Sequence, residues 1–236
     1  MDPHKRRIWE LDMLKGLALL LMIYYHTVYD LDVIFNYPID ASSFFNDLTA
    51  KASGSLFIFT AGVSSYLSKN NAKRVLRLAA IALGITAATY LVNPGMMITF
   101  GILHFLAVSI LLGLLFSRFP SWLTLLFGVA LIAASPTLLS LAAPSRWIYF
   151  LLGLAPGFAV SSDYYPLLPW FGIFLCGNAA GKGLYQRRQS LLSFVPPDNW
   201  FIWVGRHTLA VYLVHQPLII GVLYLINLVV LGATVK

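Results

Sequence analysis

The chain has 236 residues, of which 59% are hydrophobic and 11% are charged, and its formal net charge is +7. Soluble domains carry about 25% charged residues and about 45–50% apolar ones, so a chain of this length cannot hide this much apolar surface from water. The composition excludes a soluble domain and a disordered chain, and the single cysteine, Cys176, excludes a framework of intramolecular disulfides. We therefore predict an all-α integral membrane protein whose apolar runs are its spans.

Seven apolar runs have roughly the 20 residues that a membrane-spanning helix needs. In chain order they cover residues 13–33, 52–68, 75–93, 98–117, 121–142, 165–185 and 201–226. Residues 147–158 are apolar but too short to cross; we expect them to lie at the interface or to re-enter, or to add an eighth span by pairing with a neighbour. Pro196 and Pro197 mark residues 195–199 as a linker. We predict one transmembrane domain, residues 1–236, with about seven helices (six to eight).

Lysines and arginines lie mostly on one side of these predicted spans. If the N-terminus is inside, the inner side carries thirteen of the 16: Lys5, Arg6, Arg7, Lys15, Lys69, Lys73, Arg74, Arg77, Arg118, Lys182, Arg187, Arg188 and Arg206. The outer side carries Lys51, Arg146 and Lys236. This bias predicts a multi-pass protein of a bacterial-type plasma membrane with a cytoplasmic N-terminus. The expected partner of the basic residues is the lipid bilayer and not a nucleic acid, and we expect the first span to be retained because no cleavage site follows it.

Four histidines lie inside the predicted spans, where ionisable side chains are costly and usually mark function; one of them, His207, lies near the inner end of the last span. His26, His104 and His215 lie at similar depth towards the outer side, on three different spans. They would form one polar site if the bundle brings them together. Asp30 lies four residues after His26, so the two share a helix face. A carboxylate bonded to one imidazole nitrogen makes the other a better general base; the alternative is a polar pair that anchors the span at the headgroups.

His215 and His104 each have a structural alternative. His215 precedes Gln216 and Pro217, and proline frees a carbonyl and kinks a helix beside it, as happens in helices that line cavities. Packing against a neighbouring carbonyl explains His215 equally well. His104 has no charged neighbour in the sequence, and as a single residue it fits a structural role best.

Further polar and aromatic residues lie at the ends of the predicted spans. Asp12 and Lys15 flank the inner end of the first span and have the spacing of an ion pair; alternatively, Lys15 and Arg206 bind an anionic cytosolic molecule. Trp170 begins the sixth span as either an interfacial tryptophan or a wall of the outer site. Gly177 and Gly181, four residues apart in that span, would allow close helix packing within one chain or between two chains. A homodimer is therefore possible.

Five segments, taken in order, resemble one known family. They read RIWELDMLKGLALLLM (residues 7–22), LFIFTAGVS (56–64), FGILHFLAVS (100–109), PWFG (169–172) and GRHTLAVYLVHQPL (205–218). Together they are similar to the heparan-alpha-glucosaminide N-acetyltransferase family and its bacterial relatives, within the transmembrane acyltransferases.

The resemblance implies an enzyme that takes an acyl group, usually acetyl, from acyl-CoA on the cytosolic side. The group would pass to an amine or hydroxyl of a sugar, glycan or similar acceptor on the other side, with acetyl-CoA as co-substrate and no metal. The expected catalytic residues are His26, Asp30, His104 and His215. The expected donor-binding residues are Asp12, Lys15, Arg206, Trp170 and Gln216.

In the mechanism that we expect, His26 is oriented by Asp30 and takes the proton of the acceptor. His104 or His215 then stabilises the oxyanion, and a two-step route through an acetyl-histidine stays open.

Two features depart from the family pattern. Lys15 stands where the pattern has arginine, which keeps the charge but loses bidentate binding of phosphate. Lysosomal members place their proposed catalytic histidine in the loop after the first span, but this chain has no histidine between Asp30 and Ala50. That residue cannot be carried over, and His26 is more similar to the first-span histidine of membrane acyltransferases that modify surface glycans.

Three other functions are open on the residues alone. A proton-coupled transporter would also use histidines inside the membrane, although the sequence has no internal repeat. A haem-binding electron carrier would use two of the three histidines as axial ligands. A protein that only binds a lipid or glycan would carry the same pattern without activity.

Overall fold

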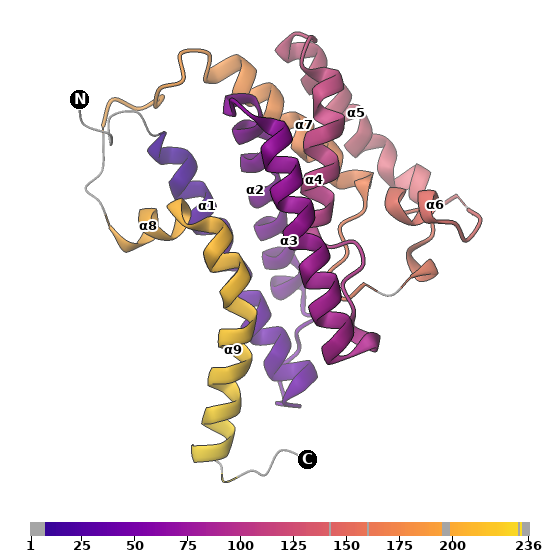
Figure 1. Ribbon diagram of the computed structural model, residues 1–236, viewed down its shortest axis with the longest axis vertical. Helices are drawn as coiled ribbons and strands as arrows, with labels where there is room; N and C mark the ends of the chain where they lie inside the picture. The colour runs from indigo at the N-terminus through magenta and orange to yellow at the C-terminus, as the bar shows by residue number, and fades with distance from the viewer. Residues whose placement is uncertain (1–7, 142, 160, 195–198, 231, 233–236) are drawn as a thin grey trace. The chain divides into compact units, whose positions relative to one another are not determined.

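The computed structural model describes residues 8–141, 143–159, 161–194, 199–230 and 232. These residues form helices joined by loops, and the β-bridge found among them pairs Ile98 with Ser161 (Figure 1). The predicted all-α membrane class is confirmed. The basic residues Lys5, Arg6, Arg7 and Lys236, and the linker residues 195–198, lie outside the described residues.

The long helices follow the predicted apolar runs. They are α1 (Trp9–Tyr29), α2 (Phe44–Leu67), α3 (Asn71–Val92), α4 (Ile102–Gly113), α5 (Ser121–Leu139), α7 (Leu167–Leu184) and α9 (Thr208–Val230). The shorter elements are η2 (Asp30–Ile34, a π-helix), η3 (Pro94–Met96), η4 (Leu114–Phe116), α6 (Trp147–Leu152), η5 (Pro156–Phe158) and α8 (Trp200–Arg206).

Not every long helix meets the length and hydropathy of a membrane span. Among the described residues, four segments do: Trp9–Ile34, Asn71–Val92, Ser121–Leu139 and Thr208–Val229. Ile102–Phe116 is a shorter apolar helix. The count of seven spans, the orientation of the N-terminus and the bacterial plasma membrane therefore stay predictions.

The predicted span over residues 201–226 consists of two helices, because the chain turns at His207 between α8 and α9. The Asn199 side chain caps the start of α8 by accepting a hydrogen bond from the Ile202 amide at 2.9 Å. The Thr208 hydroxyl donates to the Gly205 carbonyl at the other end of α8. Side chain–backbone bonds of this kind compete with the backbone bonds that would continue a helix. The seven-residue helix α8 is therefore a separate element.

The apolar residues 147–158 form the short helix α6 and the turn η5. Gly153 ends α6 with a φ of 93°, a left-handed conformation that favours glycine. A helix of six residues is far too short to cross a bilayer. Their predicted place at the interface, or as a re-entrant segment, stays a prediction.

The chain divides into two compact units, which are described separately. Unit 1 comprises Met1–Phe57 with Ser190–Lys236, and unit 2 comprises Ile58–Gln189. In unit 1, α1 packs against α8 and α9. In unit 2, α7 packs against α5 and α4, and α3 packs against α4. The predicted single domain stays a prediction.

Glycines bring the helix backbones of unit 2 into contact. A Cβ atom added at Gly177 would overlap the Phe59 carbonyl, and one added at Gly62 would overlap the Phe174 carbonyl. At Gly181 it would lie 3.0 Å from Tyr66 Cβ. The glycine step of the sixth predicted span is thus used for packing within the chain, and a homodimer stays a prediction.

Lys182 lies in the last turn of α7, at its C-terminal end, in unit 2. Its Nζ donates to the carbonyls of Phe116 at 2.5 Å and Phe119 at 3.0 Å, and to the Thr124 hydroxyl at 3.1 Å. Three donors with three acceptors fully satisfy a buried ammonium group. This lysine therefore holds the connection from α4 to α5 in place.

Candidate active site

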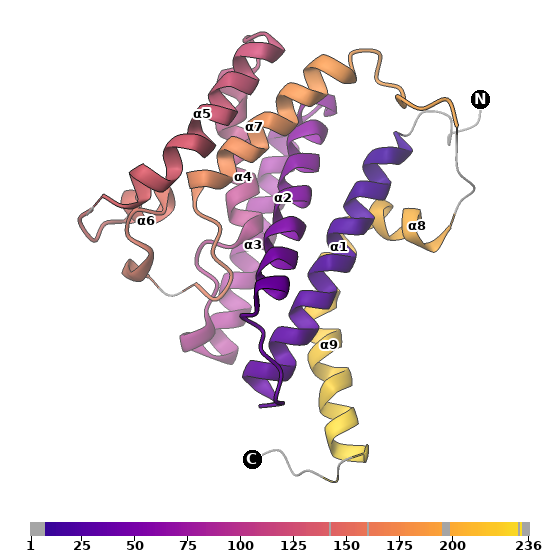
Figure 2. The same cartoon turned by 180° about the vertical axis from the view of Figure 1, so that it is seen from behind.

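In unit 1, α1 with η2 and α9 lie side by side and run in the same direction (Figure 2). His26 faces His215, with ring centroids 5.1 Å apart. Further along, in the loop after η2, the Tyr37 hydroxyl donates to Asn227 Oδ1 of α9 at 3.3 Å. The residue numbers of the contacting partners increase in the same direction in both segments, so the two helices are parallel. This agrees with the prediction that both spans start on the same side.

Asp30 lies where α1 passes into the π-helix η2, and its side chain is fully buried. The Gln216 amide Nε2 donates to both carboxylate oxygens, at 2.9 and 3.0 Å. The Asp30 amide donates to the His26 carbonyl, but among the described residues the Asp30 carboxylate forms no hydrogen bond with the His26 ring. A donor on a neighbouring helix satisfies the carboxylate instead. That Asp30 orients His26 stays a prediction.

His215 has a ring tautomer that its surroundings fix. Nδ1 is hydrogen-bonded to the Tyr212 carbonyl, and because a carbonyl only accepts, Nδ1 must carry the proton. The neutral ring then has a lone pair on Nε2. That atom is buried in a side chain that is 8% exposed, and it has no partner in the described part of the chain. The carbonyl contact of the structural alternative is thus present, yet one ring nitrogen stays open for chemistry.

His26 is half-buried, with Tyr25 on one side at a centroid distance of 5.8 Å and His215 on the other. Across the residues that the structure describes, its ring makes no hydrogen bond. Two of the three histidines that the sequence singled out are therefore brought together, and both keep nitrogen atoms available.

His104 belongs to unit 2, where it joins α4 to α3. Its Nε2 lies 3.1 Å from the Thr86 hydroxyl, which itself lies 2.6 Å from the Ile98 carbonyl. A hydroxyl has one hydrogen to donate, and the shorter contact takes it, so His104 Nε2–H donates to Thr86. This contact fits the structural alternative, while a part for His104 in catalysis stays a prediction.

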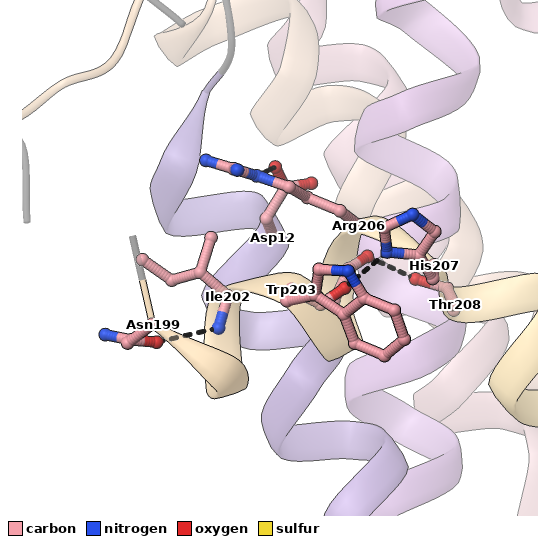
Figure 3. Close-up of polar contacts among 8 residues, drawn as sticks. Asp12, Asn199, Ile202, Trp203, Arg206, His207 and Thr208 are labelled. Atoms are coloured by element: carbon pink, nitrogen blue, oxygen red, sulfur yellow. Dashed lines mark hydrogen bonds and ion pairs between the residues drawn. The ribbon is translucent and has the colours of Figure 1, made fainter. Parts of the chain in front are cut away.

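At the other end of α1, Asp12 forms an ion pair with Arg206, whose Nε lies 3.7 Å from Asp12 Oδ2 (Figure 3). Gly205 allows this approach, because a Cβ atom there would overlap the Asp12 carbonyl. Lys15 lies one turn further along α1 and is half-buried. Two of the predicted donor-binding residues, Asp12 and Arg206, thus pair with each other.

The remaining predicted donor-binding residues lie in different settings. Gln216 binds Asp30, and Trp170 packs against Tyr165 in unit 2 with centroids 5.0 Å apart. Tyr212, whose carbonyl fixes the tautomer of His215, was not among the residues predicted from the sequence. Its position three residues before His215 on a helix is the signal that could have found it.

Comparison with curated proteins and with solved structures gives no match to this chain. The family model for heparan-alpha-glucosaminide N-acetyltransferase, catalytic, matches residues 7–217. The matched range contains both histidines of the pair, Asp30, Gln216 and the ion pair of Asp12 with Arg206. With most of its length covered, the chain belongs to the heparan-alpha-glucosaminide N-acetyltransferase catalytic family, a family of transmembrane acetyltransferases.

Proposed function

We propose that the protein moves an acetyl group from cytosolic acetyl-CoA to an amine or hydroxyl of a sugar or similar acceptor on the opposite side, at the His26–His215 pair. One observation carries the site assignment. His215 is a buried histidine with a fixed tautomer and an open Nε2, and it lies directly beside a second histidine. Family membership supports the reaction class.

The pair has the chemistry that acyl transfer needs. The acceptor nitrogen or oxygen attacks the acetyl carbonyl carbon, the carbon–sulfur bond breaks, and CoA leaves as the thiolate. The proton of the acceptor passes to the lone pair on His215 Nε2, which acts as general base. His26 faces that ring and can share the positive charge or contact the acetyl oxygen.

The donor would approach from the inner end of α1. Lys15 and Arg206 supply positive charge there for the phosphates of CoA. Lys15 precedes His26 by eleven residues on one helix, which is about 16 Å at 1.5 Å per residue. A long, thin pantetheine arm suits such a distance between the phosphate end and the thioester end.

Acetyl transfer by protein reconstituted in vesicles tests the proposal. Radiolabelled acetyl-CoA is supplied on one side and an amino sugar on the other, for wild type, His26→Ala and His215→Ala. Loss of the general base His215 typically lowers the rate about 10²–10⁴-fold, and loss of a group that stabilises the oxyanion lowers it about 10²–10³-fold, so we expect both variants to lose at least 99% of transfer. His207→Gln is the matched control, because that ring is exposed and bonds the Trp203 carbonyl in α8.

A separate binding measurement keeps the result interpretable. Acetyl-CoA at 100 times its dissociation constant should stabilise the detergent-solubilised protein by about 2.7 kcal/mol. Wild type and both histidine variants should show this shift in melting temperature, above CoA and ATP controls. A histidine variant that keeps more than a tenth of the transfer rate contradicts the site, and a wild type without the shift at millimolar acetyl-CoA contradicts the acetyltransferase.

A further inference from the structure

Two neighbouring side chains of α9 carry buried polar atoms that lack a hydrogen-bond partner within the described ranges: Nε2 of His215 and Oε1 of Gln216. His215 contacts α1 at His26, and Gln216 contacts η2 at Asp30. Buried polar atoms without partners are rare in native proteins, and each one calls for an explanation. Two such atoms on adjacent residues of one helix, one of them in the His26–His215 pair, point to a bound ligand.

Their surroundings make both atoms hydrogen-bond acceptors. The Tyr212 carbonyl holds the proton of His215 on Nδ1, which leaves Nε2 with its lone pair. The amide nitrogen of Gln216 faces both oxygens of the Asp30 carboxyl group, so the amide oxygen faces away from it. Neither group can turn to become a donor without losing its existing bond.

A molecule that satisfies this pair must bring hydrogen-bond donors. The reacting thioester of acetyl-CoA has no hydrogen to donate, and the nearest donor of CoA is an amide N–H of its pantetheine arm. The reacting amine or hydroxyl of an acceptor does carry a hydrogen, and a sugar carries further hydroxyls beside it. His215 Nε2 therefore fits the reacting group of the acetyl acceptor, and a hydroxyl next to that group fits Gln216 Oε1.

We propose that His215 and Gln216 form the acceptor-binding site, and that Gln216 selects acceptors carrying a second hydrogen-bond donor beside the group that is acetylated. This inference rests on the proposed function and moves Gln216 from the donor site, where the sequence placed it. The reacting amine or hydroxyl donates to His215 Nε2 and loses its proton there. A neighbouring hydroxyl donates to Gln216 Oε1 and remains bound throughout the reaction.

Asp30 is a positioning residue in this arrangement, since it fixes the orientation of the Gln216 amide. Asp30→Asn has nearly the same shape but carries an amide nitrogen, which can donate to Gln216 Oε1. That substitution would occupy the acceptor atom from inside the protein. It should weaken recognition of the second donor without removing either histidine.

The test compares two probe acceptors, trans-2-aminocyclohexanol and cyclohexylamine, which share the ring and the amine and differ by one hydroxyl. For wild type we expect kcat/KM to favour the amino alcohol roughly 10- to 100-fold, because the site leaves a buried acceptor unpaired with the simple amine. In Asp30→Asn the preference should fall to within about 3-fold, through a higher KM for the amino alcohol. The KM for acetyl-CoA should stay unchanged.

A second variant guards against loss of folding. Asp30→Leu combined with Gln216→Leu removes both polar partners, which is far milder than leaving one of them unpaired, and it should also abolish the preference. Gln186→Leu, at an exposed glutamine in unit 2, is the matched control and should keep it.

Each remaining outcome decides against one proposal or the other. A wild type that uses both probes equally, or neither while it acetylates glucosamine, overturns the acceptor site. A raised KM for acetyl-CoA in the variants returns Gln216 to the donor site and also overturns it. A wild type that transfers acetyl to no amine or sugar, and that acetyl-CoA does not stabilise, overturns the proposed function itself.

Discussion

The side chains of Asp30 and Gln216 join α1 to α9 through one amide nitrogen that reaches both oxygens of a fully buried carboxylate. The two residues are 186 positions apart in the chain. In a setting without water, a carboxylate depends on the donors that the protein supplies. This contact therefore links the alignment of the two helices to the state of one acidic side chain.

Removing the Gln216 amide alone should lower the free energy of unfolding more than removing both Asp30 and Gln216. Gln216→Ala leaves the buried carboxylate unpaired, and we expect it to lower the free energy of unfolding by about 1.5–3 kcal/mol. Asp30→Leu together with Gln216→Leu should cost less than the single change. Chemical denaturation in detergent measures both, and equal losses in the two variants would show that the contact contributes little.

The close approach of α1 and α8 should be sensitive to one methyl group. Gly205→Ala places a Cβ atom against the Asp12 carbonyl, so we expect a loss of about 1–3 kcal/mol from overpacking. Gly221→Ala on α9 is the control, because a Cβ atom there meets no described atom within 4 Å. If melting temperatures of the two variants fall equally, the packing of α8 on α1 differs from that described here.

Lys182 should be far more important to stability than a lysine at the surface. Lys182→Met leaves the Phe116 and Phe119 carbonyls without their donor, and we expect a loss of at least about 2 kcal/mol. Lys51→Met removes an exposed i,i+4 ion pair with Asp47 and should change stability by less than about 0.5 kcal/mol. Thermal unfolding of both proteins under one condition makes the comparison, and similar melting temperatures would contradict it.

Tyr164, in the loop before α7, should ionise at a higher pH than an ordinary tyrosine. Burial raises the pKa of Tyr164 to about 12 from its ordinary value of 10, where its hydroxyl donates to the Phe150 carbonyl. Because the folded-state pKa is the higher one, the stabilising effect of the neutral phenol is complete below pH 10 and is lost as the pH rises towards 12. The absorbance of tyrosinate, measured against Tyr164→Phe, should show its titration near pH 12; a midpoint near 10 would contradict the burial of this ring.

The sequence predicted the helices well because long apolar runs have few alternatives in a membrane. It also named His26, Asp30, His215 and Gln216 as site residues. Their pairing could not be read from it. Spacing along one helix favours Asp30 as partner of His26, whereas its actual partner lies on another helix, and only packing decides between them.

The break at His207 was missed for a related reason. Residues 201–226 have the composition of one span, and composition dominated the prediction. The side chain–backbone bond at the junction of α8 and α9 comes from a single side chain, Thr208, which changes the apolar character of the segment very little. Short capping motifs of this kind deserve more weight where a predicted span is unusually long.

The parallel contact of α1 with α9 also has a consequence for biosynthesis. His26 and Asp30 leave the ribosome long before His215 and Gln216, with 186 residues separating Asp30 from its partner. At 5–20 residues per second, translation of that interval takes roughly 10–40 s. During this time α1 must hold an unpaired acid and a solitary imidazole, sheltered by lipid, water or the insertion machinery. The His26–His215 pair therefore forms only after α9 has been made, and a chain interrupted before α9 would contain one half of its histidine pair.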